Sequence, residues 1–144
     1  MIKKNIYTPE ERINDKLDEI IMFYHELVDN LPEEETFLDN TLMRRGLEKT
    51  LELLVNCMVD VALIIISKFN YEKPIDSCGA IEELYKNKVI DQKLKEKVAD
   101  LISFRNLLVH RYGKIDEKLE FENIKENHED ILEFVKRIEL FNKT

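Results

Sequence analysis

The segment from Leu51 to Ile66 most constrains how this chain can fold. It forms the second half of a helix predicted from about Glu35 to Phe69, and its apolar side chains point to nearly every side of that helix. Ordinary one-sided packing cannot cover such a helix. We therefore expect other helices, a second subunit, or both to surround it. The segment contains Asn56 and Asp60 and is too short to span a bilayer, so we interpret it as a buried helix.

Other helices can be placed from their end signals. Thr8-Pro9-Glu10-Glu11 combines a capping box with a proline at the first helical position, and Pro32 follows the end of this helix. We expect a short helix around Ala80 to Lys86 and a last helix from roughly Glu120 to Phe141. Between them, Asp91 can cap a helix that stops at Gly113. The pattern predicts an all-α, four- to five-helix up-and-down bundle, a single domain over 1–144, paired as a homodimer through the second helix.

Composition supports this fold class and limits the functions. The chain has 144 residues, 44% hydrophobic and 36% charged, with only three glycines and three prolines, which is typical of a helical domain. Its net charge of -8 argues against gripping nucleic acid through phosphate neutralisation alone. This net charge does not exclude a local cationic pocket built from Arg105, Arg111 and Lys114. Cys57 and Cys78 form no metal-binding motif, and we expect neither a metal nor a cofactor. Two cysteines are too few for a disulfide framework, which favours a cytoplasmic location, and we expect no contact with a membrane.

The end of the predicted helix around residue 105 gathers the residues with the most chemistry. At about 100° per residue, Arg105 and Tyr112 fall within the apolar stripe of this helix, while Asn106 and His110 stack together on its far flank. A guanidinium in an apolar face is unfavourable unless it is paired or lines a site. This helix end therefore carries a permanent cation, an amide, an imidazole and a phenol.

A second polar feature runs along the long predicted helix at four-residue steps. It consists of Glu48, Glu52, Asn56 and Asp60. One interpretation is a partly solvated edge of the helix. The other is that one of the carboxylates of Glu48, Glu52 or Asp60 pairs with Arg105 and fixes its direction. Arg44 and Arg45, nearby, are either surface charge or an extension of a phosphate-binding path.

The spacing of Arg105, His110 and Tyr112 spells R-x-x-x-x-H-x-Y with Asn106 directly after the arginine. In its helical setting this motif resembles that of the HEPN superfamily, and more closely that of the HepT-like toxins. The resemblance implies a dimeric, helical, metal-independent RNA endonuclease that is the toxin of a toxin–antitoxin pair. It also implies a nucleotidyltransferase antitoxin that can attach AMP to Tyr112. The catalytic pair would be Arg105 and His110, with Asn106 as an accessory.

The chemistry of these side chains agrees with that resemblance. RNA is cut without a metal when its 2′-hydroxyl attacks the neighbouring phosphodiester, which spares DNA. His110 can transfer protons near neutral pH, as base or acid, and Arg105 can donate to the phosphoryl oxygens. Asn106 could hold the imidazole or contact the backbone.

One geometric difficulty affects this mechanism. Arg105 and His110 differ by about 140° around an ideal helix. Fraying of the last turn would narrow this angle, whereas a two-fold interface would merge two sites into one cleft, which is our working hypothesis. The alternative function is a non-catalytic nucleotide-binding or scaffold subunit that partners a nucleotidyltransferase.

Overall fold

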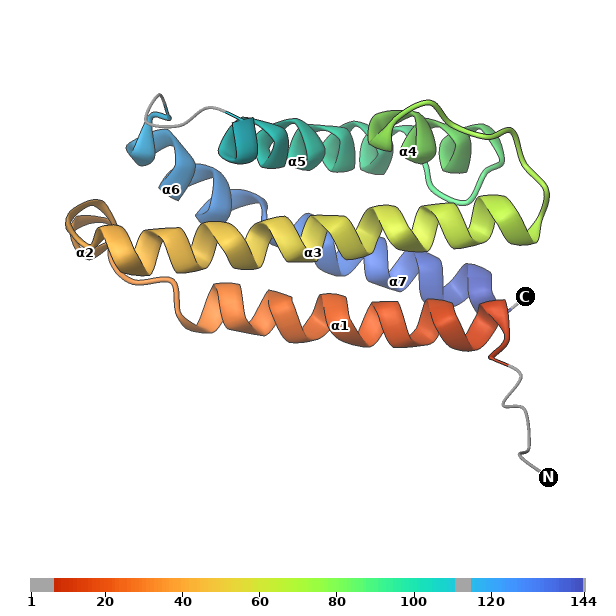
Figure 1. The fold of residues 1–144 in the computed structure, drawn as a ribbon, viewed down its shortest axis with the longest axis horizontal. Helices are drawn as coiled ribbons and strands as arrows, with labels where there is room; N and C mark the ends of the chain where they lie inside the picture. Colours follow the sequence, from red (N-terminus) through yellow and green to blue (C-terminus); the bar gives the residue numbers. More distant parts are fainter. Residues whose placement is uncertain (1–6, 111–114, 144) are drawn as a thin grey trace.

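The computed structural model describes residues 7–110 and 115–143 and arranges them as an up-and-down bundle of helices. The prediction of an all-α bundle is confirmed. The central helix α3 runs antiparallel to α1 on one side, with α4 and α5 on the other side and α7 behind it (Figure 1). The helices of the described residues are α1 (Pro9–Asp29), α2 (Glu34–Asp39), α3 (Thr41–Lys68), α4 (Ser77–Lys86), α5 (Gln92–His110), α6 (Glu117–Asn127) and α7 (Glu129–Lys143).

Helix α3 is enclosed by its neighbours, as its apolar pattern predicts. Val59 and Ile64 lie about 140° apart around the helix, and each is only 7% exposed. By length and composition α3 would also qualify as a membrane span, but 61% of its most apolar window is buried inside the bundle. A central helix covered by α1, α4 and α5 accounts for that hydropathy. Leu63, at 42% exposure, is one of its apolar side chains left at the surface.

The prediction of one continuous helix from Glu35 to Phe69 is wrong, because the chain forms two helices that are separated at Asn40. Asn40 has extended backbone angles, and its side-chain oxygen accepts a hydrogen bond of 3.0 Å from the Met43 amide. It therefore caps α3, and the residues before it form the separate short helix α2. Asparagine favours such caps because its side chain replaces a missing helical hydrogen bond. A sequence pattern that continues across Asn40 does not reveal this break.

The predicted last helix is also divided, into α6 and α7. The His128 ring nitrogen Nδ1 lies 2.9 Å from the Lys125 carbonyl oxygen and 3.3 Å from that of Ile124. These are carbonyls that the backbone amides of a continuous helix would use. The break raises the number of helices in the described residues to seven, against the four or five expected. It also lets α6 lie across the end of the bundle, near α2 (Figure 1).

A buried arginine joins the helices at this end. Arg44 is 7% exposed, so it is not the surface charge that the sequence allowed. Its Nη1 donates to the carbonyl oxygens of Phe37 and Leu38, each at 3.0 Å, and its Nη2 lies 3.1 Å from the Glu117 carboxylate. The carbonyls belong to α2 and the carboxylate to the first turn of α6. Arg44 thus fastens the helix that follows the 111–114 segment to the start of α3.

Candidate functional site

The guanidinium of Arg105 is half-buried on α5 and is held by uncharged groups. It donates from Nη1 to Oδ1 of Asn56 on α3, and from Nε to Oδ1 of Asn106 at 3.0 Å. Its Nη2 lies 3.4 Å from the hydroxyl of Ser77, the first residue of α4. The site is therefore built where three helices meet. Among the described residues, none of the recorded partners of Arg105 is a carboxylate, so its charge is held in place without being neutralised.

The prediction that a carboxylate of α3 pairs with Arg105 is wrong, because each of the three candidate acids has another neighbour. Glu52 lies 3.4 Å from Lys49, one turn away on the same helix, and Asp60 lies 3.4 Å from Lys16 on α1. Glu48 faces the buried carboxyl of Glu120 on α6. The predicted polar line does exist on α3. Its one amide, Asn56, accepts the hydrogen bond from Arg105, and none of its acids does.

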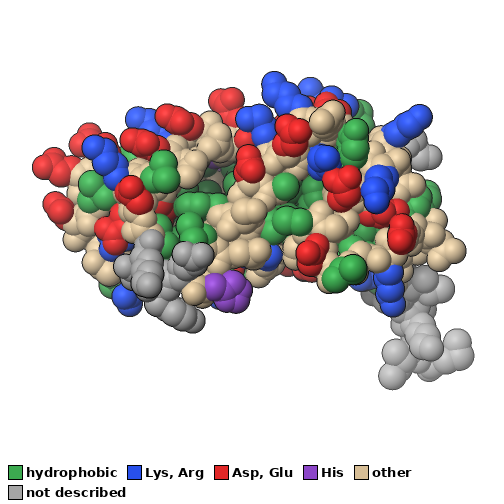
Figure 2. All heavy atoms as spheres, turned by 90° about the horizontal axis from the view of Figure 1, so that it is seen from above, with side chains coloured by type: hydrophobic (Ala, Val, Ile, Leu, Met, Phe, Trp, Pro, Cys, Tyr) green, Lys and Arg blue, Asp and Glu red, His purple; other side chains and the backbone are tan. Residues whose placement is uncertain are grey.

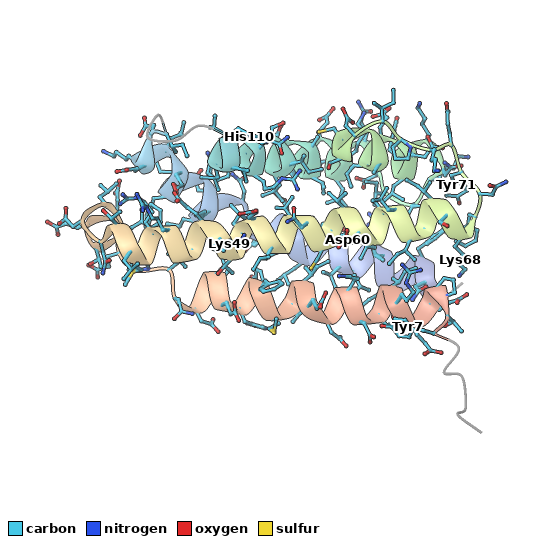
Figure 3. The ribbon with its side chains drawn as sticks, viewed as in Figure 1. Tyr7, Lys49, Asp60, Lys68, Tyr71 and His110 are labelled. Carbon is cyan, nitrogen blue, oxygen red and sulfur yellow. The ribbon has the colours of Figure 1, made fainter. Side chains whose placement is uncertain are left out.

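Asn106 and His110 have different surroundings although they are one turn apart. The Asn106 carboxamide binds Arg105, rather than the imidazole or the backbone as expected. His110 is exposed at the C-terminal end of α5, and no hydrogen bond joins it to Arg105. Figure 3 shows His110 on the outer side of the bundle, away from the labelled residues of α3. Within the described residues of one chain, then, the hydrogen bonds of Arg105 go to Asn56, Asn106 and Ser77 and not to His110.

Tyr112 lies in 111–114, outside the described residues, as do Arg111 and Lys114. Its predicted role as the AMP acceptor is therefore not tested by the structure. The segment that contains it connects the exposed end of α5 to α6, whose first turn is fixed by Arg44.

Sequence reasoning missed Ser77 as a neighbour of Arg105. A serine that opens a short helix looks like a helix-start residue, and only tertiary packing brings its hydroxyl to α5. Cys78 lies beside it, and burial raises the pKa of its thiol above the ordinary value, which the nearby Arg105 only partly opposes. Cys78 therefore stays a neutral thiol near neutral pH and is poorly suited to act as a nucleophile.

The structure groups no metal-binding side chains in the part of the chain that it describes. There, no three or more His, Cys, Asp or Glu side chains are placed to hold an ion. Metal-independent chemistry remains a prediction, and it depends on what Arg105 and His110 can do.

Comparison with known proteins places this geometry in a family. Residues 15–138 match the family model described as Ribonuclease HepT-like. A candidate RNase of Archaeoglobus fulgidus is 33% identical over 64 residues, a match that spans 44% of this chain and only 48% of that relative.

Two solved structures are similar in fold. One contains the tri-AMPylated HEPN toxin of Shewanella oneidensis in complex with an MNT antitoxin; it is 18% identical, covers 90% of this chain and 98% of the other, and has a TM-score of 0.86. The cytosolic protein YutE of Bacillus subtilis is 21% identical, covers 89% of each chain and has a TM-score of 0.73. The helical bundle, the arginine–histidine helix and the match over most of the chain lead to one conclusion: this protein belongs to the HepT-like ribonuclease family.

Proposed function

We propose that this protein is a metal-independent RNA endonuclease and the toxin of a toxin–antitoxin pair. The observation that carries the proposal is the uncompensated guanidinium of Arg105, held in a fixed direction by Asn56, Asn106 and Ser77. A half-buried cation whose partners are neutral is suited to an anionic ligand. A phosphodiester is the anion that the family relation favours.

In the proposed reaction, the 2′-hydroxyl of RNA attacks the adjacent phosphorus and the 5′-oxygen of the next nucleotide leaves. The imidazole of His110 moves a proton, either from the attacking hydroxyl or to the leaving oxygen. Arg105 donates hydrogen bonds to the phosphoryl oxygens as their negative charge grows. The products are a 2′,3′-cyclic phosphate and a free 5′-hydroxyl, and no metal ion takes part.

The outward position of His110 favours a site completed by a second protomer. Within the described residues of one chain no hydrogen bond joins Arg105 to His110, whereas two motif helices facing each other would bring the arginine of one to the histidine of the other. We therefore propose a homodimer with the catalytic cleft at its two-fold axis. Pairing through α3, as the sequence suggested, stays a prediction.

The direct test is incubation of purified protein with RNA in EDTA, followed by analysis of the new ends. We expect cyclic phosphate ends from the wild type and loss of cleavage in both Arg105→Ala and His110→Ala. DNA and 2′-O-methylated RNA should stay intact because they lack the attacking hydroxyl. His25→Ala is the matched control, since His25 is an exposed histidine on α1. Cleavage that persists in His110→Ala would contradict the proposal.

We further propose that the antitoxin is a nucleotidyltransferase that attaches AMP to Tyr112. The similar toxin of Shewanella oneidensis is tri-AMPylated and bound to an MNT antitoxin, which supports this proposal. Mass spectrometry after incubation with ATP and the transferase of the same genome would find AMP on the peptide that contains Tyr112. The Tyr112→Phe variant should stay unmodified, and modification elsewhere in the chain would contradict the assignment.

A second candidate is a non-catalytic nucleotide-binding or scaffold subunit that partners the same transferase. The lack of a hydrogen bond between Arg105 and His110 among the described residues and the net charge of -8 favour it. Tight binding of the transferase without any RNA cleavage would support this candidate over the nuclease.

A further inference from the structure

A cavity lies beside the motif helix and contains neither Arg105 nor His110. Its volume is about 380 Å³, and it opens between α5, α6 and the start of α7, with α1 and α3 beneath. That volume lies within the range of about 300–1,000 Å³ typical of small-molecule sites. Figure 2 looks onto the α4–α5 side of the molecule, where apolar side chains are visible in the hollowed surface. The apolar floor consists of Leu27, Leu51, Ile124 and Ile131.

Two amide side chains lie among the polar groups that line this cavity. Nδ2 of Asn127 donates to Oδ1 of Asn123 at 3.3 Å, and both residues line the cavity. This bond leaves the second N–H and the carbonyl oxygen of Asn127, together with the amide nitrogen of Asn123, available to a ligand. The half-buried ring of Phe104 also lines the cavity and offers an aromatic surface. A donor and an acceptor side by side, with an aromatic ring and an apolar floor, suit the edge and face of a planar heterocycle.

The charges of the cavity disfavour a phosphate. Nζ of Lys97 lies 3.7 Å from the Asp130 carboxylate, so this cation is already paired. Asp100 adds a further negative charge to the lining. A neutral ring is therefore a better occupant than an anion, and the phosphate of the same ligand would lie outside the cavity.

The cavity reaches to within one helical turn of the proposed catalytic histidine. Leu107 lines it and precedes His110 by three residues on α5, which is about 4.5 Å along the helix axis. Ser103 is exposed at the cavity mouth, on the same outer side of α5. Within a nucleotide, only the ribose separates the base from the phosphate.

We propose that this cavity binds a nucleobase of the RNA substrate while the neighbouring phosphodiester lies at His110. The proposal rests on the ribonuclease function proposed above and adds a base-binding subsite to it. The amides of Asn123 and Asn127 would read the edge of the base, and Phe104 would contact its face. The subsite would thus influence which nucleotide lies next to the cut.

The test fills the cavity mouth and measures binding separately from cleavage. Ser103→Phe places a ring at the mouth, and Ser67→Phe adds the same bulk at an exposed position of α3 outside the cavity lining. The probes are the four ribonucleoside monophosphates, ribose 5-phosphate as a ligand without a base, and a short RNA. Binding is followed by NMR shifts of the cavity amides, and RNA cleavage by the identity of the nucleotides at the cut.

We expect at least one nucleoside monophosphate, but not ribose 5-phosphate, to shift the cavity amides. Ser103→Phe should weaken this binding about tenfold or more and alter the cut-site preference, whereas Ser67→Phe should change neither. If Ser103→Phe alters the cleavage of RNA but mononucleotides do not bind, the subsite is supported and the base enters it only as part of an RNA chain. Mononucleotide binding without RNA cleavage would support the base site while removing the nuclease function.

Two results would overturn the subsite. One is RNA cleavage in which Ser103→Phe and Ser67→Phe behave alike, which would leave the nuclease proposal intact. The other is a change in oligomeric state in Ser103→Phe without any base binding, which would make the cavity a protein interface.

Discussion

At the scale of single residues, Arg105 carries a permanent charge that its recorded partners orient but do not neutralise. Asn56 is the partner that decides this, because it holds the position on the polar line of α3 where an acid would have formed an ion pair. An amide keeps the guanidinium in place and leaves its attraction for a phosphate intact. The same geometry with a carboxylate would give a stable but less active protein.

The variant Asn56→Asp tests this interpretation. We expect the free energy of unfolding to change by no more than about 1 kcal/mol, since a new ion pair offsets the desolvation of the added charge. RNA cleavage should fall by about tenfold or more, because Arg105 would then be neutralised. Denaturant unfolding and cleavage rates measure the two effects. Asn14→Asp is the control, as it adds the same charge on the exposed side of α1 and keeps an oxygen for Asn142; equal cleavage by the two variants would contradict the argument.

Glu120 is a buried carboxyl whose protonation affects the stability of the fold. It has 0% exposure, and burial, with the neighbouring Glu48 carboxyl as the next cause, raises its pKa from 4.5 to about 9. Neither of its oxygens has a hydrogen-bond partner when both carboxyls are ionised. A proton on one of the two acids supplies the missing donor. Glu120 is therefore protonated in the folded protein near neutral pH.

This proton makes stability depend on pH in a defined direction. In the unfolded chain Glu120 has its ordinary pKa of 4.5, whereas in the folded protein its pKa is about 9. Between these two values the folded state binds a proton that the unfolded state lacks, so the free energy of unfolding falls as pH rises. Glu120→Gln should increase the free energy of unfolding at neutral pH and flatten this decline. Denaturant titrations across the window measure it. The exposed Glu122→Gln serves as the control, and an unchanged slope in Glu120→Gln would contradict the assignment.

At the scale of helices, Arg44 connects three elements that the sequence presents separately. It binds two carbonyls at the end of α2 and a carboxylate in the first turn of α6, while belonging to α3 itself. The carbonyl bonds satisfy groups that a helix end leaves unpaired. This arginine therefore holds the start of α6, the next helix along the chain after residues 111–114.

Arg44→Gln should destabilise the fold by roughly 3 kcal/mol, since it removes a buried cation from its carboxylate and carbonyl partners. The adjacent Arg45→Gln is a matched control, because Arg45 is exposed and should change stability by less than about 0.5 kcal/mol. Thermal or denaturant unfolding compares them. If the two variants have the same stability, Arg44 does not join the helices as described.

At the scale of the whole molecule, the proposed site requires two chains. Each subunit would supply the arginine of one site and the histidine of the other, so a mixed dimer of Arg105→Ala and His110→Ala subunits would keep one complete site. Both homodimers should be inactive, and mixing them should restore up to about half the wild-type activity per dimer. Cleavage assays after subunit exchange, with light scattering to establish the dimer, measure this. An inactive mixture of confirmed mixed dimers would show that each site needs both residues from one chain.

Local sequence patterns were enough to predict the fold class, which the structure confirms, and to propose where the site lies. A helix that is apolar on nearly every side cannot be covered without a bundle. The R-x-x-x-x-H-x-Y motif of Arg105, His110 and Tyr112 assigns the proposed chemistry to one helix end. These features depend on local spacing, which a sequence displays directly. The caps at Thr8 and Asp91 were likewise predictable, because the bonds that they accept come from residues three positions along the chain.

Only the packing of the helices against one another selects the groups that surround Arg105. Four polar residues on α3 share one line in the sequence, and only the relative rotation and height of α3 and α5 select Asn56 from them. The same holds for Ser77, which packing brings to the site, and for Arg44, which is buried although its neighbour Arg45 is exposed. Such contacts join residues far apart in the chain, so periodicity within one helix carries no information about them.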